Sequence, residues 1–345
     1  MPVSIVVGGQ FGSEGKGKVA HYLAQKMEAS FAVRCGGPNS GHTVIDPSGK
    51  ARIFQQLPTA AILPDVKLAI CAGSYIDLDI LLREMRETGV GPDRLIIDPD
   101  SVIITEEIKQ REVQSGLIGR IGSTGSGTGA AVVARINREE SLVFARNVKA
   151  LSGFMQNVPD ILRGCLNKKE RIIIEGTQGF GLSPLHSRYY PFVTSRDTTA
   201  SAFLSETGLS PFDVDDVVLT IRAFPIRVSG NSGPMDNEIT WRDISEKGKF
   251  IQNFQETTSV SKKTRRVALF SDKIVREAIK INKPSTIVIN HLDYFSSKRD
   301  SVFMMKVQNF INDVEKGISQ KINYIGLGPD KTMVNKFSSF EVCNG

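Results

Sequence analysis

A glycine-rich loop near the N-terminus carries the clearest chemical signal in the sequence. Residues 8–18 read GGQFGSEGKGK, and residues 12–18 satisfy the phosphate-binding pattern G-x-x-x-x-G-K. In such a loop, backbone N–H groups and the N-terminus of the next helix face phosphate oxygens, and a lysine, here Lys16 or Lys18, supplies a mobile charge. Val19 stands where a hydroxyl ordinarily holds magnesium, so a metal would need other ligands. The loop predicts a nucleoside triphosphate site; the alternative is a strand-to-helix turn that merely needs glycine.

A second loop, at residues 34–43 (RCGGPNSGHT), places a histidine after a flexible turn. The charge of an imidazole changes near neutral pH, so His42 could exchange a proton with a bound ligand. A lone loop histidine is more often solvated than catalytic, so His42 by itself decides nothing. Further glycine-rich stretches at 122–129 and 176–181 are interpreted as other loops of the same site.

The elements that must carry these loops alternate between strands and helices. Apolar or β-branched runs, typical of parallel strands buried on both faces, occur at residues 3–7, 68–71, 95–97, 172–174, 217–221 and 286–289. Apolar residues at helical spacing predict helices at 19–27, 78–85 and 152–166. The pattern predicts an α/β fold: a doubly wound, mostly parallel sheet with a P-loop-like N-terminal strand–loop–helix and inserted loops. Without a repeat or a clear linker, residues 1–345 are expected to form a single domain.

Composition narrows the class of protein. The chain is 40% hydrophobic and 23% charged, as in ordinary globular proteins, and no apolar run suggests a membrane span or a secretory signal. Four scattered cysteines lack metal-type spacing, so we expect reduced thiols and a cytoplasmic protein. The net charge of +6 is spread along the chain without interleaved aromatic residues, which favours small anionic ligands over nucleic acid.

Together, the first two loops closely resemble those of the adenylosuccinate synthetase family, which carries G-x-Q-W-G-D-E-G-K-G-K and G-G-x-N-x-G-H-T. The resemblance continues in order along nearly the whole chain, through residues 122–127 (GSTGSG), 175–179 (EGTQG), 190–195 (YPFVTS), 257–266 (TTSVSKKTRR), 290–293 (NHLD) and 328–332 (GPDKT). The length resembles that of the short, archaeal-like branch of the family.

The resemblance implies a two-step ligation. In the family, the 6-oxygen of IMP attacks the γ-phosphate of GTP, and the amine of aspartate then displaces the phosphate. The family's loop aspartate takes the N1 proton and binds magnesium; its histidine stabilises or protonates the 6-oxygen region, and the glycine before it offers magnesium a carbonyl. His42 and Gly41 match the last two roles, whereas Ser13 replaces the aspartate. A hydroxyl is no general base unaided and a weaker magnesium ligand, so the proton acceptor stays open, with Glu14 one candidate.

The serine admits two interpretations. It marks either a catalytically inactive nucleotide-binding relative or a changed purine, because a short side chain near N1 leaves room for the 2-amino group of guanine and can accept its hydrogen bond. A phage group of the family, which makes the precursor of 2,6-diaminopurine DNA, has a small residue here and converts dGMP, aspartate and ATP to 2-amino-2'-deoxyadenylosuccinate. Resemblance to that group, with the retained His42, Lys18, Gln178 and Arg265, favours a ligase acting on dGMP; synthesis from IMP with GTP is the alternative.

The resemblance also assigns ligands to residues of this chain. The catalytic group comprises Ser13, His42, Lys18 and Gln178, and Mg²⁺ is expected at Ser13 and Gly41. The purine monophosphate is expected at Ser13, Asn39, Ser123, Thr124, Arg138, Gln178 and Thr194, and L-aspartate at Thr258, Ser259, Val260, Ser261, Lys263 and Arg265. The triphosphate is expected at Gly12, Glu14, Gly15, Lys16, Gly17, Lys18, Thr43, Asn290, Asp293, Gly328 and Pro329.

Three of these assignments keep alternatives open. Residues 290–293 differ from N-K-x-D at His291: the retained Asp293 favours GTP, but the diaminopurine group uses ATP or dATP, which is the donor expected here. Arg138 aligns with an arginine that reaches the nucleotide from the partner subunit, which implies a homodimer; the alternative is a solvated arginine. The basic run Lys262, Lys263, Arg265 and Arg266 either clamps the carboxylates of aspartate or is a solvated loop, and Lys263 stands where the family has arginine.

Overall fold

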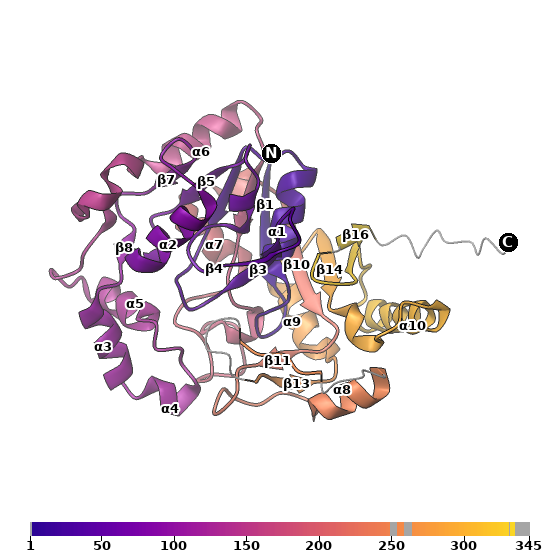
Figure 1. Cartoon of the computed structure of the whole chain (residues 1–345). Coiled ribbons are helices and arrows are strands. Elements are labelled where there is room, and N and C mark those ends of the chain that lie inside the picture. The colour runs from indigo at the N-terminus through magenta and orange to yellow at the C-terminus, as the bar shows by residue number, and fades with distance from the viewer. Residues whose placement is uncertain (1, 249–253, 259–263, 331, 335–345) are drawn as a thin grey trace.

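The computed structural model describes residues 2–248, 254–258, 264–330 and 332–334. Within them, the strands of the main sheet are, in chain order, β1 (Val3–Gly8), β2 (Phe31–Arg34), β5 (Lys67–Ile70), β7 (Leu95–Ile97), β9 (Ile172–Glu175), β10 (Val214–Arg222), β14 (Thr286–Asn290), β15 (Tyr324–Gly326) and β16 (Thr332–Val334). Their order across the sheet is β16-β15-β14-β10-β1-β9-β2-β5-β7. Figure 1 labels strands of this sheet from β16 on the right to β7 on the left. All neighbouring pairs are parallel except β15 with β16, which confirms the predicted α/β class.

Helices cover both faces of this sheet. The helices of the described residues are α1 (Lys16–Lys26), α2 (Leu78–Thr88), α3 (Glu106–Gln114), α4 (Leu117–Ile121), α5 (Thr128–Asn137), α6 (Val158–Asn167), α7 (Ala200–Thr207), α8 (Trp241–Gly248), α9 (Asp272–Asn282) and α10 (Ser301–Ile318), of which α1, α2, α6, α7, α9 and α10 pack on the sheet. β1 is buried on both sides: Ile5 and Val7 join the core that contains residues of α6, α7, α9 and α10, whereas Val6 joins the core that contains residues of α1 and α2. Two-sided burial explains why the strands are continuous apolar runs.

The predicted helices at 19–27 and 78–85 are confirmed as α1 and α2, whereas the start predicted for the third was wrong. A short 3-10 helix spans Lys149–Phe154, and α6 begins only at Val158. The side chain of Asn157 accepts a hydrogen bond from the N–H of Asp160, and Pro159 occupies the first turn. An asparagine cap followed by proline is a strong helix start, and it overrides the apolar spacing farther upstream.

Smaller elements extend from the main sheet. β3 (His42–Ile45) pairs with β4 (Ala51–Phe54), and β6 (Tyr75–Ile76) with β8 (Val102–Ile103). β13 (Arg266–Ala268) lies between β11 (Ile226–Arg227) and β12 (Glu238–Ile239). In Figure 1, α3, α4 and α5 form a group beside the main sheet, and β11 and β13 lie with α8 near its lower edge. These segments are the inserted loops that the sequence predicts.

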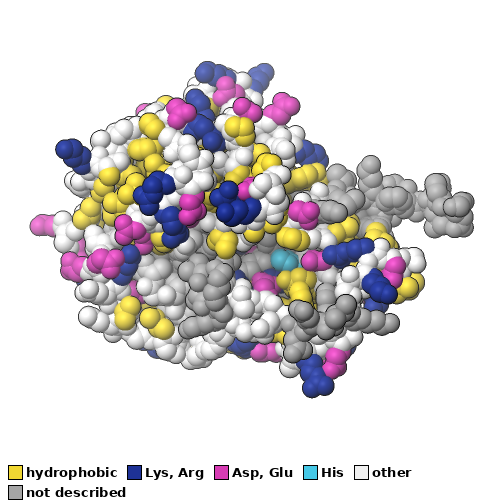
Figure 2. Space-filling model, viewed as in Figure 1, with side chains coloured by type: hydrophobic (Ala, Val, Ile, Leu, Met, Phe, Trp, Pro, Cys, Tyr) yellow, Lys and Arg dark blue, Asp and Glu magenta, His cyan; other side chains and the backbone are white. Residues whose placement is uncertain are grey.

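Two further features concern the apolar character of the helices and the charges on the surface. None of the described helices combines the length and apolar character needed to cross a bilayer. On the face that Figure 2 shows, basic and acidic side chains are interspersed.

Candidate functional site

The glycine-rich loop leaves β1 at Gly8 and enters α1 at Lys16. Two glycines in it adopt backbone conformations that disfavour side chains: φ is 94° at Gly12 and 87° at Gly15. Ser13, between them, also has a positive φ of 57°. The loop therefore turns tightly between β1 and α1.

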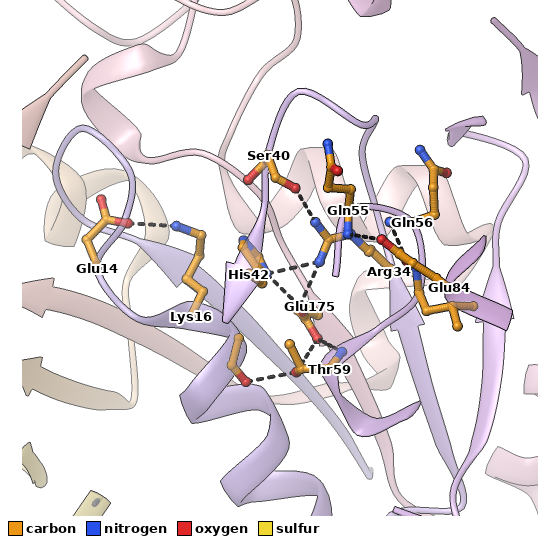
Figure 3. A network of polar contacts seen from close by, with 12 residues as sticks. Glu14, Lys16, Arg34, Ser40, His42, Gln55, Gln56, Thr59, Glu84 and Glu175 are labelled. Atoms are coloured by element: carbon orange, nitrogen blue, oxygen red, sulfur yellow. Dashed lines mark hydrogen bonds and ion pairs between the residues drawn. The ribbon is translucent and has the colours of Figure 1, made fainter. Parts of the chain in front are cut away.

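Glu14 fills the interior of this loop. Its carboxylate accepts hydrogen bonds from the N–H of Gln10 at 3.1 Å and of Gly12 at 2.7 Å, and pairs with Lys16 Nζ at 2.6 Å. The side chains of Glu14 and Lys16 are both almost completely buried, and Figure 3 shows them pointing toward each other. Glu14 is thus directed into the loop. Its carboxylate already has three donors, so it is poorly placed to accept a proton from a ligand.

Lys18 is the second loop lysine, and it lies close to the segment at 328–332. Its Nζ donates to the carbonyl of Gly328 at 2.9 Å. Burial lowers the pKa of Lys18 to about 8, although the negative charges of Asp293 and Asp330 act in the opposite direction. An ammonium with a depressed pKa is favoured when a phosphate arrives, because the new anion restores the charged form.

This depressed pKa leads to the first testable prediction. Because only the ammonium attracts phosphate, the KM for the nucleoside triphosphate should rise as the pH increases beyond about 8, by up to about tenfold per pH unit. In a Lys18→Arg variant the guanidinium stays charged, so this rise should disappear below pH 10. The measurement is KM for the nucleoside triphosphate that supports turnover, between pH 7 and pH 9.5 at constant ionic strength. Identical pH profiles in the two proteins would contradict the prediction.

His42 begins β3 and lies in a buried network, shown in Figure 3. Its Nδ1 is 2.5 Å from Glu175 Oε1, at the end of β9, and Arg34 Nη1 donates to the same carboxylate oxygen at 2.9 Å. The other oxygen of Glu175 accepts from both the N–H and the hydroxyl of Thr59, each at 2.8 Å. Arg34 also donates to the carbonyl of Ser40 at 2.7 Å, so the arginine ties this network to the second glycine-rich loop.

The network sets the protonation state of His42. Burial and, after it, the positive charge of Arg34 lower the pKa of His42 to about 4. The ring is therefore neutral at pH 7, and its Nδ1–H donates to Glu175, which leaves Nε2 as an acceptor. A carboxylate that fixes the tautomer and orientation of an imidazole is a recurring feature of proton-transfer sites. His42 is therefore buried and hydrogen-bonded, and it is not the solvated side chain that is usual for a lone loop histidine.

The loop at residues 122–127 meets an acidic side chain that the sequence analysis missed. Ser123 donates its hydroxyl to Glu112 Oε1 at 2.7 Å, and the N–H of Gly129, at the start of α5, donates to Glu112 Oε2 at 2.9 Å. Thr124 donates its hydroxyl to Ser126 at 3.0 Å. Glu112 comes from α3 and carries no loop motif, so only its nearness in the fold reveals it.

The segment at 290–293 also reaches the N-terminal loop. Asn290 Nδ2 donates to the carbonyl of Glu14 at 2.7 Å and lies 2.9 Å from where a Cβ on Gly15 would stand, so this position requires glycine. His291 is partly buried and packs edge-on against Tyr294, with 5.2 Å between ring centroids. Burial raises the pKa of Asp293, which lines the cavity described below. The sequence motif is thus brought directly against the loop.

One cavity of about 1430 Å³ joins these loops. The predicted site residues that line it are Gly12, Ser13, Gly15, Lys16, Gly17, Lys18, Asn39, Gly41, His42, Thr43, Ser123, Thr124, Gln178, Thr194, Thr258, Arg265, Asp293, Gly328 and Pro329. Its volume suits several ligands bound side by side, because the pocket for a single drug-sized molecule is about 300 to 1,000 Å³.

A few predicted residues lie elsewhere. Glu14 and Asn290 are buried beneath the loop, and Arg138 is exposed at the end of α5; none of the three lines the cavity. Ser259, Val260, Ser261 and Lys263, together with Lys262, fall outside the described residues. Conversely, Glu256 and Tyr294 line the cavity although the sequence analysis did not single them out.

Comparison with known proteins identifies relatives of this architecture. The family model described as "Adenylosuccinate synthetase" matches residues 5–146 and 140–302. Adenylosuccinate synthetase of Methanococcus aeolicus is 35% identical over 340 residues, covering 96% of this chain and 98% of the relative. The enzyme of the same name from Methanocaldococcus jannaschii is 35% identical over 337 residues, covering 95% of this chain and 94% of the relative.

Two solved structures share the fold. Succinoaminodeoxyadenylate synthetase (PurZ) of cyanophage S-2L, bound to dGMP and to dATP as an energy donor, superposes with a TM-score of 0.82 at 29% identity, covering 96% of this chain and 95% of that chain. Fully ligated adenylosuccinate synthetase of Plasmodium falciparum superposes with a TM-score of 0.84 at 18% identity, covering 97% of this chain and 100% of that one.

Proposed function

The chain belongs to the adenylosuccinate synthetase family of C–N ligases, and from this premise we propose that it joins L-aspartate to dGMP rather than to IMP. The observation that carries the proposal is the hydroxyl of Ser13 at the position where the family has an acid. Ser13 lines the cavity, and its own carbonyl accepts a hydrogen bond at 2.9 Å from Arg222, a side chain with no exposed surface. The backbone that carries the hydroxyl is therefore held in place.

Neighbouring carboxylates do not restore the missing acid. Glu14 follows directly in the sequence, but its oxygens are bonded inside the loop and do not border the cavity. A purine edge next to Ser13 thus meets a short hydroxymethyl group, which leaves space for the 2-amino group of guanine. The hydroxyl oxygen has no partner among the described residues and can accept a hydrogen bond from that amine.

The proposed reaction has two steps. First, O6 of dGMP bonds to the γ-phosphorus as the bond from that phosphorus to the β–γ bridging oxygen breaks; the nucleoside diphosphate leaves and N1 loses its proton. Next, the amine nitrogen of aspartate bonds to C6, the C6–O6 bond breaks, phosphate leaves with O6, and the nitrogen loses a proton. The product is 2-amino-2'-deoxy-N6-succinyladenylate. A loose phosphoryl-transfer transition state makes little demand on a general base, which suits a site without the family's aspartate.

The residues divide among the ligands as follows. Lys18, beside Gly328, would bind the transferred phosphate. The imidazole of His42 would face the 6-oxygen; the negative charge of the bound phosphates would favour its protonated form, in which Nε2–H donates to that oxygen. Gln178 and Asn39 would contact the purine, while Ser123, Thr124 and Thr194 would hold its monophosphate. Arg138, exposed at the end of α5, would contact the nucleotide of the partner subunit in a homodimer.

Magnesium fits this site through oxygen ligands. The hydroxyl of Ser13 and the carbonyl of Gly41 belong to residues on the cavity wall, and both are hard oxygen donors without charge. Mg²⁺ accepts such ligands together with waters and substrate phosphates, which would supply the negative charge. When bound, the ion neutralises charge on the transferring phosphate.

ATP or dATP is the proposed donor. In the family pattern N-K-x-D a lysine packs along the base, but here His291, which lines the cavity beside Tyr294, occupies that position of the motif. The cyanophage protein was solved with dATP as its energy donor, and it resembles this chain over nearly its whole length. The retained Asp293 is the observation in favour of GTP.

A second candidate is synthesis from IMP with GTP. Its support is the name adenylosuccinate synthetase carried by the archaeal relatives at 35% identity. The deciding experiment combines purified protein, aspartate and Mg²⁺ with ATP or GTP and with dGMP, GMP or IMP, and follows product by chromatography. We expect turnover of dGMP with ATP. Turnover of IMP but not dGMP would overturn the proposal, and no product with any pair would indicate an inactive nucleotide-binding protein.

A further inference from the structure

Glu256 lies between the loop that carries Ser13 and the arginine assigned to aspartate. It lines the cavity, and its side chain is 20% exposed. Arg222 donates to it through both terminal nitrogens, Nη2 to Oε2 at 2.7 Å and Nη1 to Oε1 at 3.4 Å. The hydroxyl of Tyr294 donates to Oε2 at 2.8 Å, and Nε of Arg265 is 3.4 Å from Oε1. Three donor side chains from separate segments therefore converge on one carboxylate.

These contacts define what Glu256 can do. A carboxylate offers about four lone-pair sites, and here each oxygen already faces two donors. Burial by itself would raise the pKa of Glu256, but the charge of Arg222 prevails and lowers it to about 2. The group is thus ionised and fully engaged, so it is no proton acceptor for a substrate. Its remaining capacity is to hold the donors around it.

Glu256 and Thr257 contact Arg265 through its Nε and its backbone N–H. Its Nε donates to the carbonyl of Thr257 at 3.3 Å and faces Glu256 Oε1, and its backbone N–H donates to the carbonyl of Glu256 at 2.9 Å. Both contacts that this side chain makes with described residues use Nε, so within that part of the chain the two terminal nitrogens are left for other groups. Those two nitrogens form the fork that binds a carboxylate in bidentate geometry.

Glu256 also separates two positive charges. The charge of Arg222 is among the factors, after burial, that lower the pKa of Arg265, whereas the charge of Glu256 opposes this effect. Without the carboxylate, two largely buried guanidinium groups would repel each other across the gap that it now fills. Arg265 would then turn away from its present position.

We propose that Glu256 is the positioning residue of the aspartate subsite. It fixes Arg265 through Nε, so that the terminal nitrogens of the guanidinium bind a carboxylate of the incoming aspartate. Through Arg222, which also holds the carbonyl of Ser13 at 2.9 Å, the same carboxylate joins the aspartate subsite to the purine loop. The inference rests on the proposed function, because that function assigns Arg265 to aspartate.

The test is Glu256→Gln, which keeps the shape but places an amide N–H₂ among donors. We expect the KM for aspartate to rise about tenfold, the loss of one charge-assisted contact, while kcat and the KM of the purine nucleotide change less than about threefold. Calorimetric titration of aspartate onto each protein, with purine nucleotide and nucleoside diphosphate bound, should give the same ratio without turnover. An unchanged aspartate KM and affinity would overturn the proposal.

Two further proteins make the result specific. Asp213→Asn removes the carboxylate from the bidentate pair with Arg163, at 2.7 Å for both contacts; Asp213 directly precedes β10, at the end of that strand opposite to Arg222. Its aspartate KM should stay within twofold of the parent, and an equal rise would sink the proposal. In an Arg265→Lys background, Glu256→Gln should have little additional effect on aspartate; full additivity would mean that Glu256 does not act through Arg265.

Failure of folding and failure of the proposed function give different results. If Glu256→Gln does not fold, Glu256→Asp replaces it, because this variant keeps the charge on a shorter side chain. Its KM for aspartate should lie between the parental value and ten times that value. A KM for aspartate equal to the parental value would overturn the inference. Kinetics use whichever of dGMP and IMP the parent converts. A parent that converts neither refutes the proposed function, while the calorimetric comparison still decides on Glu256.

Discussion

Ser13→Asp is expected to lower kcat/KM for dGMP on the order of 100-fold. The added carboxyl group occupies space that the proposal gives to the 2-amino group, and overpacking of this kind costs about 1 to 3 kcal/mol. The loop has little freedom to relax, because the carbonyl of Ser13 is bonded to the fully buried Arg222 and φ of Gly12 is 94°. IMP lacks the 2-amino group, so its kcat/KM should stay unchanged or rise. The measurement is steady-state kinetics of each protein with dGMP and with IMP.

A matched control exists at the end of α10. Ser319 has almost the same backbone conformation, with φ of 56° against 57° for Ser13, but it is exposed. Ser319→Asp adds the same charge in the same conformation and should leave both activities within twofold. Ser13→Ala separates the steric effect from the hydrogen bond, because alanine keeps the space but removes the acceptor. We expect kcat/KM for dGMP to fall about tenfold. Parental dGMP kinetics in Ser13→Asp would refute the steric argument.

His42→Asn is expected to lower kcat by about 10³-fold, within the range of about 10² to 10⁴ for a positioned proton-transfer group. Asparagine can keep a hydrogen bond to Glu175 but offers no imidazole nitrogen to the 6-oxygen. Because His42 in the unliganded protein has a pKa of about 4, its titration should cause no change in kcat/KM of the parent between pH 6 and pH 8. Single-turnover and steady-state measurements with dGMP test both statements.

Loss of fold must be separated from loss of chemistry in that variant. Glu175 would retain Arg34 and both contacts from Thr59, so the melting temperature should fall by no more than a few degrees. His186, which is exposed and does not line the cavity, supplies the control: His186→Asn should keep the parental kcat. A His42→Asn protein that is folded and retains more than a tenth of the parental kcat would contradict the assigned role.

Much of the fold could be predicted because local patterns determine it. Six apolar runs in the sequence are strands of the main sheet, since two-sided burial leaves them almost no polar residues. β2 escaped prediction because its four residues end in Arg34, a charge that a strand tolerates here only because Glu175 pairs with it. The early start predicted for α6 failed because the cap at Asn157 was not weighed.

Much of the candidate site could be predicted for the same reason, since its loops are contiguous motifs. The groups that hold those loops could not be, because they meet across long stretches of chain. Arg34 and Glu175 are 141 residues apart, and Arg222 and Ser13 are 209 apart. Neither Arg222 nor Glu256 stands in a motif that signals chemistry. A sequence pattern indicates which loop binds, whereas the partners that fix its shape follow only from the sheet order.

The internal bonds of Glu14 determine what ligand binding must cost. Because the loop amides of Gln10 and Gly12 are already satisfied by a carboxylate of the protein, the loop has its shape before any phosphate enters. The conformational entropy of ordering it is lost during folding rather than during association. If the carboxylate of Glu14 no longer held these two amides, the loop would become ordered only on binding. Capture of the proposed nucleotide should then be slower and more temperature-sensitive, with an unfavourable entropy change that the intact protein lacks.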